Sequence, residues 1–364
     1  MTPRRNSNPS GNGPDRRLAI VFILPNVSIN GLTKVALHEI RNLDAIVRVV
    51  SLVKERREFP VLTKGLEIIY PNGSEILGRL MYPRYLKARH VTKFDIIIAN
   101  NLPSIVVAHR LYKRTHIPYI AYIHNDHTSI HGTRPNFDKR QIIQALDNAA
   151  GILVNSKVLA SQIASIYGSR KASILYPGCY VFRNLSEEKD NFYLVVHMVS
   201  LSPNFDILYR LLLRNKTIRV VIAGAKKYLW QYVYLRFKLK FGSRVDFVFD
   251  PTDEELSNLY RRSKMLLHTG IETFGMSPLE AAAHSTPSIA VKGSGVLEVL
   301  EQDKEIFVFA GDNVEQLNQI IENTYYDTEV LSEMGRKAYQ KALKYDWNAH
   351  VKLLTTVINE CLSS

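Results

Sequence analysis

The sequence predicts an α/β protein in which helices cover both faces of parallel β-sheets. Short runs rich in Ile and Val alternate with longer helical patterns along the whole chain. These runs lack polar alternation, which is typical of strands buried on both faces of a sheet. Strand–helix alternation indicates βαβ units, and the pattern breaks once near the middle and then restarts. We therefore expect two Rossmann-like, doubly wound domains that face each other across a cleft.

The first domain is expected over residues 18–180. The strand patterns are Leu18–Leu24, Ala45–Ser51, Asp95–Ala99, Tyr119–Ile123 and Ile152–Asn155. The helical patterns between them are Leu32–Leu43, Ser104–Thr115, Asp138–Ala149 and Lys157–Tyr167.

The pattern breaks at residues 176–191, which are rich in turn formers and then in charged residues, so we place a linker at 181–191. A second domain is expected over residues 192–345, and a terminal helix at 346–364 is expected to pack back on the first domain. The second set of strands is Tyr193–Val199, Arg219–Ala223, Val245–Phe249, Met265–His268, Ser288–Val291 and Ile306–Phe309. The closing helices are Val330–Leu343 and Trp347–Leu362.

The chain composition is that of a globular protein, with 46% hydrophobic and 22% charged residues. Residues 1–17 are polar and basic and lack an apolar centre, so we expect a disordered tail rather than a secretory signal. No apolar run of about 18 residues predicts a membrane span. Cys179 and Cys361 lie far apart and form no metal or redox motif. These features favour a cytoplasmic protein. One interpretation of its charge, given below, also places it at a membrane surface.

That charge is +13, from 47 basic and 34 acidic residues, and it attracts anions of any kind. No zinc-finger, helix-turn-helix or RNA-recognition signature accompanies it, so nucleic acid is not an expected partner. The densest basic stretch, Tyr228–Lys240, interleaves bases with aromatic residues. One interpretation is a helix that lies on an anionic membrane surface. The favoured one is a helix with an aromatic core face and a solvated basic face.

The most informative loop runs from Glu272 to Glu280. Ser277 suits a helix N-cap, Pro278 the first helical position, and Glu280 the third position after the cap. A helix start binds anions such as phosphate, and the two carboxylates are suited to accept hydrogen bonds from hydroxyls. Phosphate together with hydroxyls describes a nucleotide sugar. Three alternatives stay open. Glu280 could be only the capping partner of Ser277, Glu272 could be a solvated loop residue, or the two could form an acid–base pair for hydrolysis.

Two other glycine-containing loops follow strands. Gly31 precedes a helix at the edge of the sheet where ligands of such folds bind, or it only makes the turn. The stretch Lys292–Glu298, KGSGVLE, opens a further helix beside the one at Ser277. Two such helix starts can hold a diphosphate without a metal, and Lys292 adds a cation. The alternative is a pair of ordinary turns.

Histidines gather after the strand that ends at Ile123. His124, His127 and His131 have spacings that suit a metal, but no Cys or paired carboxylate completes the set. We therefore expect no metal. A hydrogen-bonding role for His124 in the cleft is favoured over a purely structural one.

These residues resemble a known family. The segment GIETFGMSPLEAAAHSTPSIAVKGSGVLEVL resembles the donor-site signature of retaining, family-four type glycosyltransferases with the GT-B fold. The family has two glutamates separated by seven residues, as Glu272 and Glu280 are. An FG pair, an EA-rich helix, a Thr-Pro step and a glycine-rich loop follow, matched by Phe274-Gly275, Glu280-Ala281, Ser285–Pro287 and Gly293–Glu298. The resemblance covers roughly residues 18–362 and is loose in the first domain.

The resemblance implies a metal-independent retaining transferase of the hexosyltransferase type. It would move a sugar from a nucleoside diphosphate sugar, with UDP or GDP, to a glycan, lipid-linked or protein acceptor. The implied catalytic residues are Glu272, by the donor-sugar hydroxyls, and His124, beside the sugar. The implied donor-binding residues are Glu280 at the ribose hydroxyls, the amides of Gly275, Met276 and Ser277 at the sugar and diphosphate, Asp250 and Pro251 near the base, and Gly31 at the diphosphate.

The sequence departs from the family at one point. The family usually has an Arg and a Lys after the first strand of the second domain, which neutralise the leaving diphosphate. Here Ser200 and Phe205 stand where those bases are expected. The candidate replacements are Lys226, Lys227, Arg210 and Lys292, with Lys226 or Lys227 favoured because they end the next strand. The departure also suggests an alternative, a catalytically degenerate GT-B scaffold or partner subunit.

Overall fold

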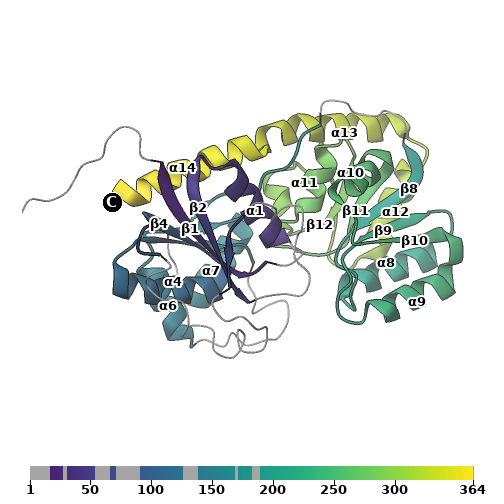
Figure 1. Ribbon diagram of the computed structural model, residues 1–364. Coiled ribbons are helices and arrows are strands. Elements are labelled where there is room, and N and C mark those ends of the chain that lie inside the picture. Colours follow the sequence, from purple (N-terminus) through teal and green to yellow (C-terminus); the bar gives the residue numbers. More distant parts are fainter. Residues whose placement is uncertain are drawn as a thin grey trace, which may run out of the picture.

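The computed structural model describes residues 17–27, 31–53, 66–70, 91–125, 138–168, 171–182 and 189–363. Two α/β domains lie side by side, the first drawn in purple to teal and the second mainly in green (Figure 1). Each contains one parallel sheet with helices packed against it. The expected fold class of two Rossmann-like domains is confirmed. The predicted tail up to residue 16, as well as His127 and His131, lies outside the described residues.

The first sheet has the order β3-β2-β1-β4-β5-β6-β7. Its strands are β1 (Leu18–Asn26), β2 (Ala45–Val53), β3 (Ile68–Ile69), β4 (Ile96–Asn100), β5 (Tyr119–Ile123), β6 (Gly151–Val154) and β7 (Ser173–Ile174). The helices are α1 (Gly31–Asn42), α4 (Asn101–Thr115), α6 (Lys139–Asp147) and α7 (Lys157–Tyr167). The sequence did not predict β3 and β7, because a two-residue strand is too short to produce a hydrophobic pattern.

The second sheet has the order β10-β9-β8-β11-β12-β13. Its strands are β8 (Asp190–Val196), β9 (Val220–Gly224), β10 (Val245–Phe249), β11 (Ser263–His268), β12 (Ser288–Val291) and β13 (Phe307–Phe309). Its helices are α8 (Pro203–Arg214), α9 (Trp230–Phe241), α10 (Asp253–Arg262), α11 (Met276–Ala282), α12 (Val314–Thr324) and α13 (Thr328–Ala342). Short 3₁₀ turns are η2 (Gly242–Arg244), η3 (Gly295–Glu298) and η4 (Leu343–Tyr345). The expected helix after Lys292 is therefore only the turn η3, and it begins at Gly295.

The strand order reverses at the same place in both sheets. β1 lies between β2 and β4, and β8 lies between β9 and β11. Ligands of open α/β sheets bind outside the carboxyl ends of the strands at such a reversal. The topology therefore directs attention to the loops that follow β1, β4, β8 and β11.

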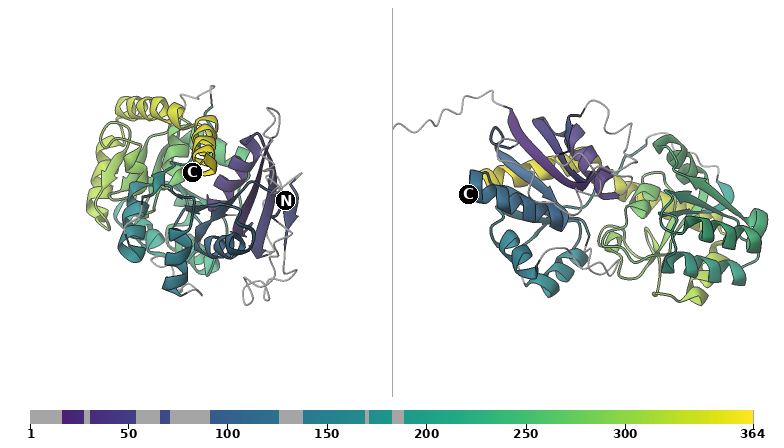
Figure 2. Two further views of the ribbon diagram at one scale, coloured as in Figure 1. Left: turned by 90° about the vertical axis from the view of Figure 1, so that its left-hand side faces the viewer. Right: turned by 60° about the horizontal axis from the view of Figure 1, so that its bottom comes forward.

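The last helix, α14 (Trp347–Ser363), leaves the second domain and lies against the first (Figure 2). Leu354 and Ile358 of α14 belong to the same buried cluster as Ile20 and Phe22 of β1. His350 places its Nε2 2.8 Å from a carboxylate oxygen of Glu39 on α1, and both side chains are buried.

Among the described helices, none combines the length and apolar character needed to cross a membrane.

A carboxylate of the second domain caps a helix of the first. The backbone N–H groups of Lys157 and Val158 donate to the two oxygens of Glu298, at 2.8 and 2.9 Å. The hydroxyl of Tyr176 also donates to Glu298, at 3.0 Å. These amides begin α7, where N–H groups have no partner within the helix and negative charge is favoured. Glu298 thus ties η3 to the first domain.

We expect Glu298→Ala to weaken this tie by about 1–2 kcal/mol, the usual cost of losing a helix cap. Hydrogen exchange should accelerate at the amides of Lys157 and Val158, and the urea midpoint should fall. Glu322→Ala, which removes an exposed glutamate from α12, is the matched control. Unchanged exchange at both amides would contradict the assignment.

Candidate functional site

The loop after β11 begins its helix earlier than predicted. Gly275, not Ser277, is the N-cap of α11, and its φ of 89° lies in the left-handed region that favours glycine. The expected N-cap role of Ser277 is therefore wrong. Its hydroxyl lies 3.2 Å from Nδ1 of the buried His268. Pro278 is still within the first turn, where a missing N–H breaks no helical hydrogen bond.

Glu280 faces the other domain. One carboxylate oxygen accepts a hydrogen bond from Nζ of Lys34 on α1 at 2.7 Å, and the other accepts from the hydroxyl of Tyr260 on α10 at 2.7 Å. Burial acts to raise the pKa of Glu280, but Lys34, by charge and hydrogen bond, and Tyr260 outweigh it, so that the pKa lies below its ordinary value. With both oxygens used in this way, the carboxylate does not form a capping box with Ser277, so that alternative is wrong.

Glu272 lies in the same loop, and 38% of its side chain is exposed. An oxygen of its carboxylate is 3.5 Å from Nδ1 of His197, which follows β8. Burial opposes ionisation, but His197 and His268 overcome it and lower the pKa of Glu272 to about 2. The pKa of both glutamates is thus lowered. A hydrolytic pair needs one carboxyl that stays protonated, so these shifts favour hydroxyl binding over hydrolysis.

His197 and Asn204 are site residues that the sequence interpretation missed. The side-chain nitrogen Nδ2 of Asn204, in the first turn of α8, is 3.1 Å from Nε2 of His197. β8 and β11 are neighbours in the sheet, so the residues after β8 lie beside the loop of Glu272. Adjacency of β8 and β11 could have predicted that His197 and Asn204 lie in the site. Phe205, by contrast, is buried in the core against Phe237, with ring centroids 6.2 Å apart.

His124 belongs to a buried polar group where β5 ends. Its side chain is buried, and its Nε2 lies 2.8 Å from the side-chain amide oxygen, Oδ1, of Asn100. Burial, and secondly His350, lower the pKa of His124 to about 3, so the ring is neutral near pH 7. Its backbone carbonyl accepts a hydrogen bond of 2.9 Å from the hydroxyl of Thr273, next to Glu272. Among the described residues, no cluster of His, Cys, Asp and Glu suits a metal.

The four candidate replacement cations make their contacts elsewhere or are exposed. Nζ of Lys226 lies over the rings of Trp230 and Phe249, 4.9 and 4.8 Å from their centroids. Arg210 pairs with Asp206 and Asp312. Lys227 and Lys292 have exposed side chains after β9 and β12.

The remaining predicted residues also lie at carboxyl ends of strands. Asp250 and Pro251 follow β10, and the N–H of Asp250 donates to the carbonyl of Gly224 at 3.1 Å. Gly31 begins α1, and a Cβ added there would lie 3.9 Å from Sδ of Met276. The starts of α1 and α11 are therefore neighbours. The structure thus brings Gly31 of the first domain to Met276 of the second, and His124 of the first domain to Thr273, the neighbour of Glu272.

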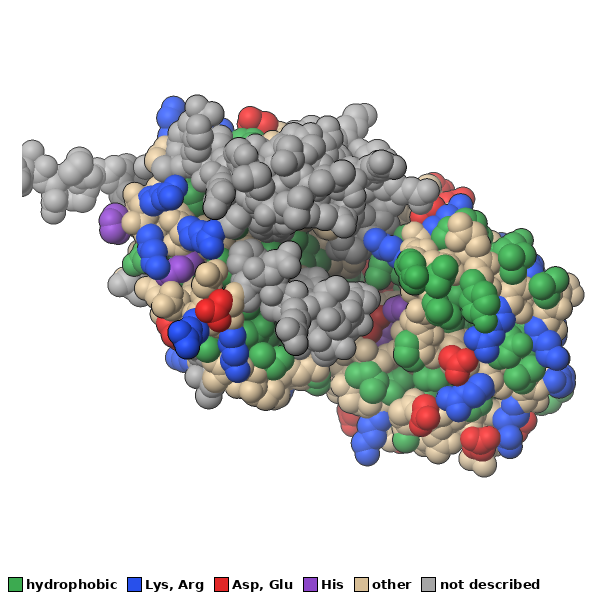
Figure 3. Space-filling view, turned by 90° about the horizontal axis from the view of Figure 1, so that it is seen from below, with side chains coloured by type: hydrophobic (Ala, Val, Ile, Leu, Met, Phe, Trp, Pro, Cys, Tyr) green, Lys and Arg blue, Asp and Glu red, His purple; other side chains and the backbone are tan. Residues whose placement is uncertain are grey.

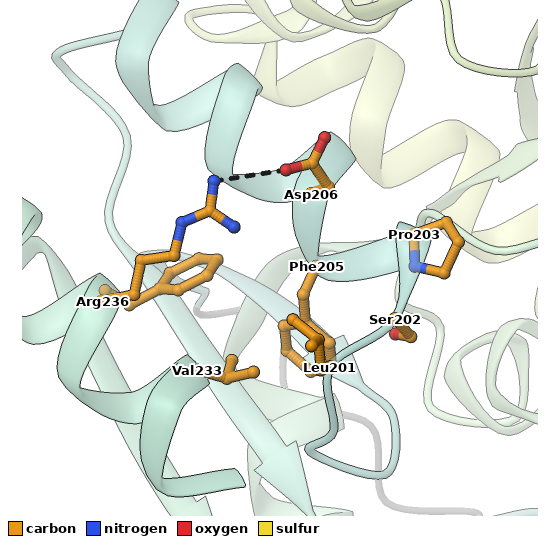
Figure 4. A pocket seen from close by; sticks show the side chains of 8 residues that line it. Leu201, Ser202, Pro203, Phe205, Asp206, Val233 and Arg236 are labelled. Carbon is orange, nitrogen blue, oxygen red and sulfur yellow. Dashed lines mark hydrogen bonds and ion pairs between the residues drawn. The ribbon is translucent and has the colours of Figure 1, made fainter. Parts of the chain in front are cut away.

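A hollow of the surface lies apart from these residues. It is formed by the start of α8 and by α9, and it is lined by Leu201, Ser202, Pro203, Phe205, Asp206, Val233, Arg236 and Phe237 (Figure 4). Arg236 pairs there with Asp206 at 3.2 Å. None of the predicted site residues lines this hollow, so we place the candidate site at the domain junction.

Both domains match models of known protein families. Residues 180–341 match the family described as glycosyl transferases group 1, and residues 29–181 match glycosyltransferase family 4. The chain is 25% identical over 345 residues to the O-antigen chain mannosyltransferase RfbU of Salmonella typhimurium, covering 84% of this chain and 92% of the relative. It is 23% identical to a D-inositol 3-phosphate glycosyltransferase of Corynebacterium diphtheriae, over 71% of this chain and 66% of the relative.

Solved structures share the fold. Anabaena HepE, in a complex with UDP and glucose, superposes with a TM-score of 0.78 at 18% identity, over 93% of this chain and 99% of that one. Sucrose-phosphate synthase from Thermosynechococcus elongatus gives a TM-score of 0.77 at 15% identity, over 95% of this chain and 100% of that one.

The ion pair of Glu280 predicts an acid-dependent loss of stability. Because the pKa of Glu280 is lower in the folded chain than the ordinary 4.5, the ionised group stabilises the fold above about pH 4.5. This contribution is lost as the pH falls through the folded pKa. We expect the free energy of unfolding to fall more steeply below pH 4.5 in the wild type than in Glu280→Gln. If the free energy of unfolding falls equally steeply with acid in both proteins, the ion pair of Glu280 does not stabilise the fold.

Proposed function

The chain belongs to the group 1 glycosyltransferases, and we propose that it transfers a sugar from a nucleoside diphosphate sugar with retention of anomeric configuration. The observation that carries the proposal is the pair of ionised glutamates at the domain junction. Glu280 and Glu272 are hydroxyl acceptors on either side of the start of α11. Ribose hydroxyls suit Glu280, and the hydroxyls of the donor sugar suit Glu272.

The proposed reaction takes place on one face of the sugar. The acceptor hydroxyl attacks the anomeric carbon as its bond to the diphosphate breaks, and the departing diphosphate oxygen takes the hydroxyl proton. Acidic side chains that hold the sugar and ribose, and donors aimed at the diphosphate, favour this transition state. His124, which is neutral and buried, fits a role in shaping the sugar site better than one in proton transfer.

The donor and acceptor are proposed by chemical class. UDP accompanies glucose in the complex of HepE, and RfbU is a mannosyltransferase of an O-antigen chain. These relatives support a UDP- or GDP-linked hexose as donor and a glycan or lipid-linked acceptor. We propose a reaction without a metal, because the sequence lacks an Asp-x-Asp pair.

We expect the wild type to hydrolyse or transfer the sugar of at least one nucleotide sugar in a panel of UDP and GDP conjugates. Glu272→Ala should lower kcat by about 100-fold or more, the usual effect of removing one group that stabilises the transition state. Glu322→Ala serves as the control. A chain that turns over no donor and gives no heat of binding with UDP or GDP would instead be the degenerate scaffold that the missing Arg and Lys suggest.

The second part of the proposal is a membrane-peripheral location, through the outer face of α9. Tyr232, Leu235 and Leu239 recur at helical spacing and are 53, 53 and 84% exposed. Residues 226–244 contain no acidic side chain. Hydrophobic side chains gather among basic ones on the lower face of the second domain (Figure 3). The core contact of α9 is made by Val233, Phe237 and Phe241, so its outer face is apolar as well as basic. An anionic bilayer complements both properties.

We expect the protein to pellet with vesicles that contain anionic phospholipid and to stay in the supernatant with neutral ones. The triple variant Tyr232→Ser, Leu235→Ser, Leu239→Ser should lose this binding, because its apolar stripe is gone.

The matched control replaces exposed apolar residues away from α9, as Ile46→Ser, Tyr326→Ser and Leu353→Ser. Equal supernatant fractions with and without anionic lipid would end this part of the proposal.

A further inference from the structure

The structure places one cation between the two domains at the site. Lys34 lies in the first turn of α1, and its amine is 2.7 Å from Glu280 and 3.9 Å from Asp253. We propose that Lys34 contacts the donor diphosphate and stabilises it as it leaves, in place of the missing Arg and Lys. This inference rests on the proposed function.

The position of Lys34 suits this role. It follows Gly31 by three residues, and Gly31 lies against Met276 at the start of α11. The amine therefore lies about one helical turn from the contact between Gly31 and Met276, two residues that the family resemblance assigns to the diphosphate. Its side chain is only 20% exposed. Burial acts against the charge, but Glu280 and Asp253 more than compensate and raise the pKa of Lys34, so it is an ammonium group throughout the physiological range.

Donor binding creates a competition for Glu280. Both carboxylate oxygens are occupied, one by Lys34 and one by Tyr260. Ribose hydroxyls that donate to Glu280 compete with Lys34, whose four-carbon chain is flexible. The diphosphate is attached to that same ribose, so the displaced amine is close to a stronger anionic partner. The negative charge on the diphosphate grows as the bond to the sugar breaks, and a nearby ammonium lowers that barrier.

The other candidates are less suited. Lys226 is held over two aromatic rings, and Arg210 is engaged by two carboxylates on the outer side of α8. The competing explanation for Lys34 is a purely structural tie between the domains. In that case its removal would disturb Glu280, and with it ribose binding, without any special effect on phosphate.

The test separates ribose from phosphate. Calorimetry compares UDP with uridine, or GDP with guanosine if the wild type prefers guanine, in the wild type, Lys34→Gln and Lys34→Arg. We expect Lys34→Gln to weaken nucleoside diphosphate binding about 10- to 100-fold, the range for a charge-assisted hydrogen bond, and to leave nucleoside binding within twofold. Lys34→Arg should restore most of the loss. The kcat of Lys34→Gln should fall more than its KM rises.

Lys352→Gln, which removes an exposed lysine of α14 that has no assigned role in the site, is the matched control for net charge. Gln can still donate to Glu280, which protects the fold. Equal losses for nucleoside and nucleoside diphosphate, or no loss for either, would overturn the role of Lys34 while leaving the proposed function intact. A wild type that binds neither compound would overturn the proposed function and this inference together.

Discussion

The contact between Glu298 and the start of α7 holds the two halves of the site in register. The residues that we assign to the donor are divided between strand ends of separate sheets, and neither sheet alone presents them all. The carboxylate satisfies two amides that a helix cannot pair internally. Beside it, a Cβ on Gly295 would come within 2.0 Å of the carbonyl oxygen of Thr273, so only glycine allows η3 to approach that closely. The loop that carries Glu272 is positioned by this packing.

The sequence was a good guide to the parts of the fold that depend on local pattern. The strand at Tyr119–Ile123 and the helix at Lys157–Tyr167 have the predicted bounds, because buried apolar runs and a Ser N-cap are local signals. The start of α11 was misplaced, because Ser, Pro and Glu form a strong capping pattern. Gly275, with its positive φ, is instead the N-cap, so the helix begins at Met276, two residues earlier than predicted. Local sequence rules did not show whether the capping pattern at Ser277 or the glycine at position 275 would set the start of the helix.

The sequence predicted the two acidic residues of the site but not the side chains that contact them. Glu272 and Glu280 stand out through their spacing in one loop. His197 precedes that loop by 75 positions and Lys34 precedes Glu280 by 246, so each pairing depends on how sheets and domains assemble. Lysines near glycine loops seemed the natural cations, yet Lys226 is retained by aromatic rings that the sequence shows only as a basic-aromatic stretch. Pairs of this kind follow from topology rather than from periodicity.

The path of α14 has a consequence for biosynthesis. Leu354 and Ile358 complete the hydrophobic cluster around β1, although more than 300 residues separate them from it in the chain. The amino-terminal half therefore emerges from the ribosome long before the side chains that cover its apolar surface exist. Until α14 has been synthesised, the apolar surface that Leu354 and Ile358 cover stays open to solvent, and we expect a chain stopped short of α14 to be less stable for that reason.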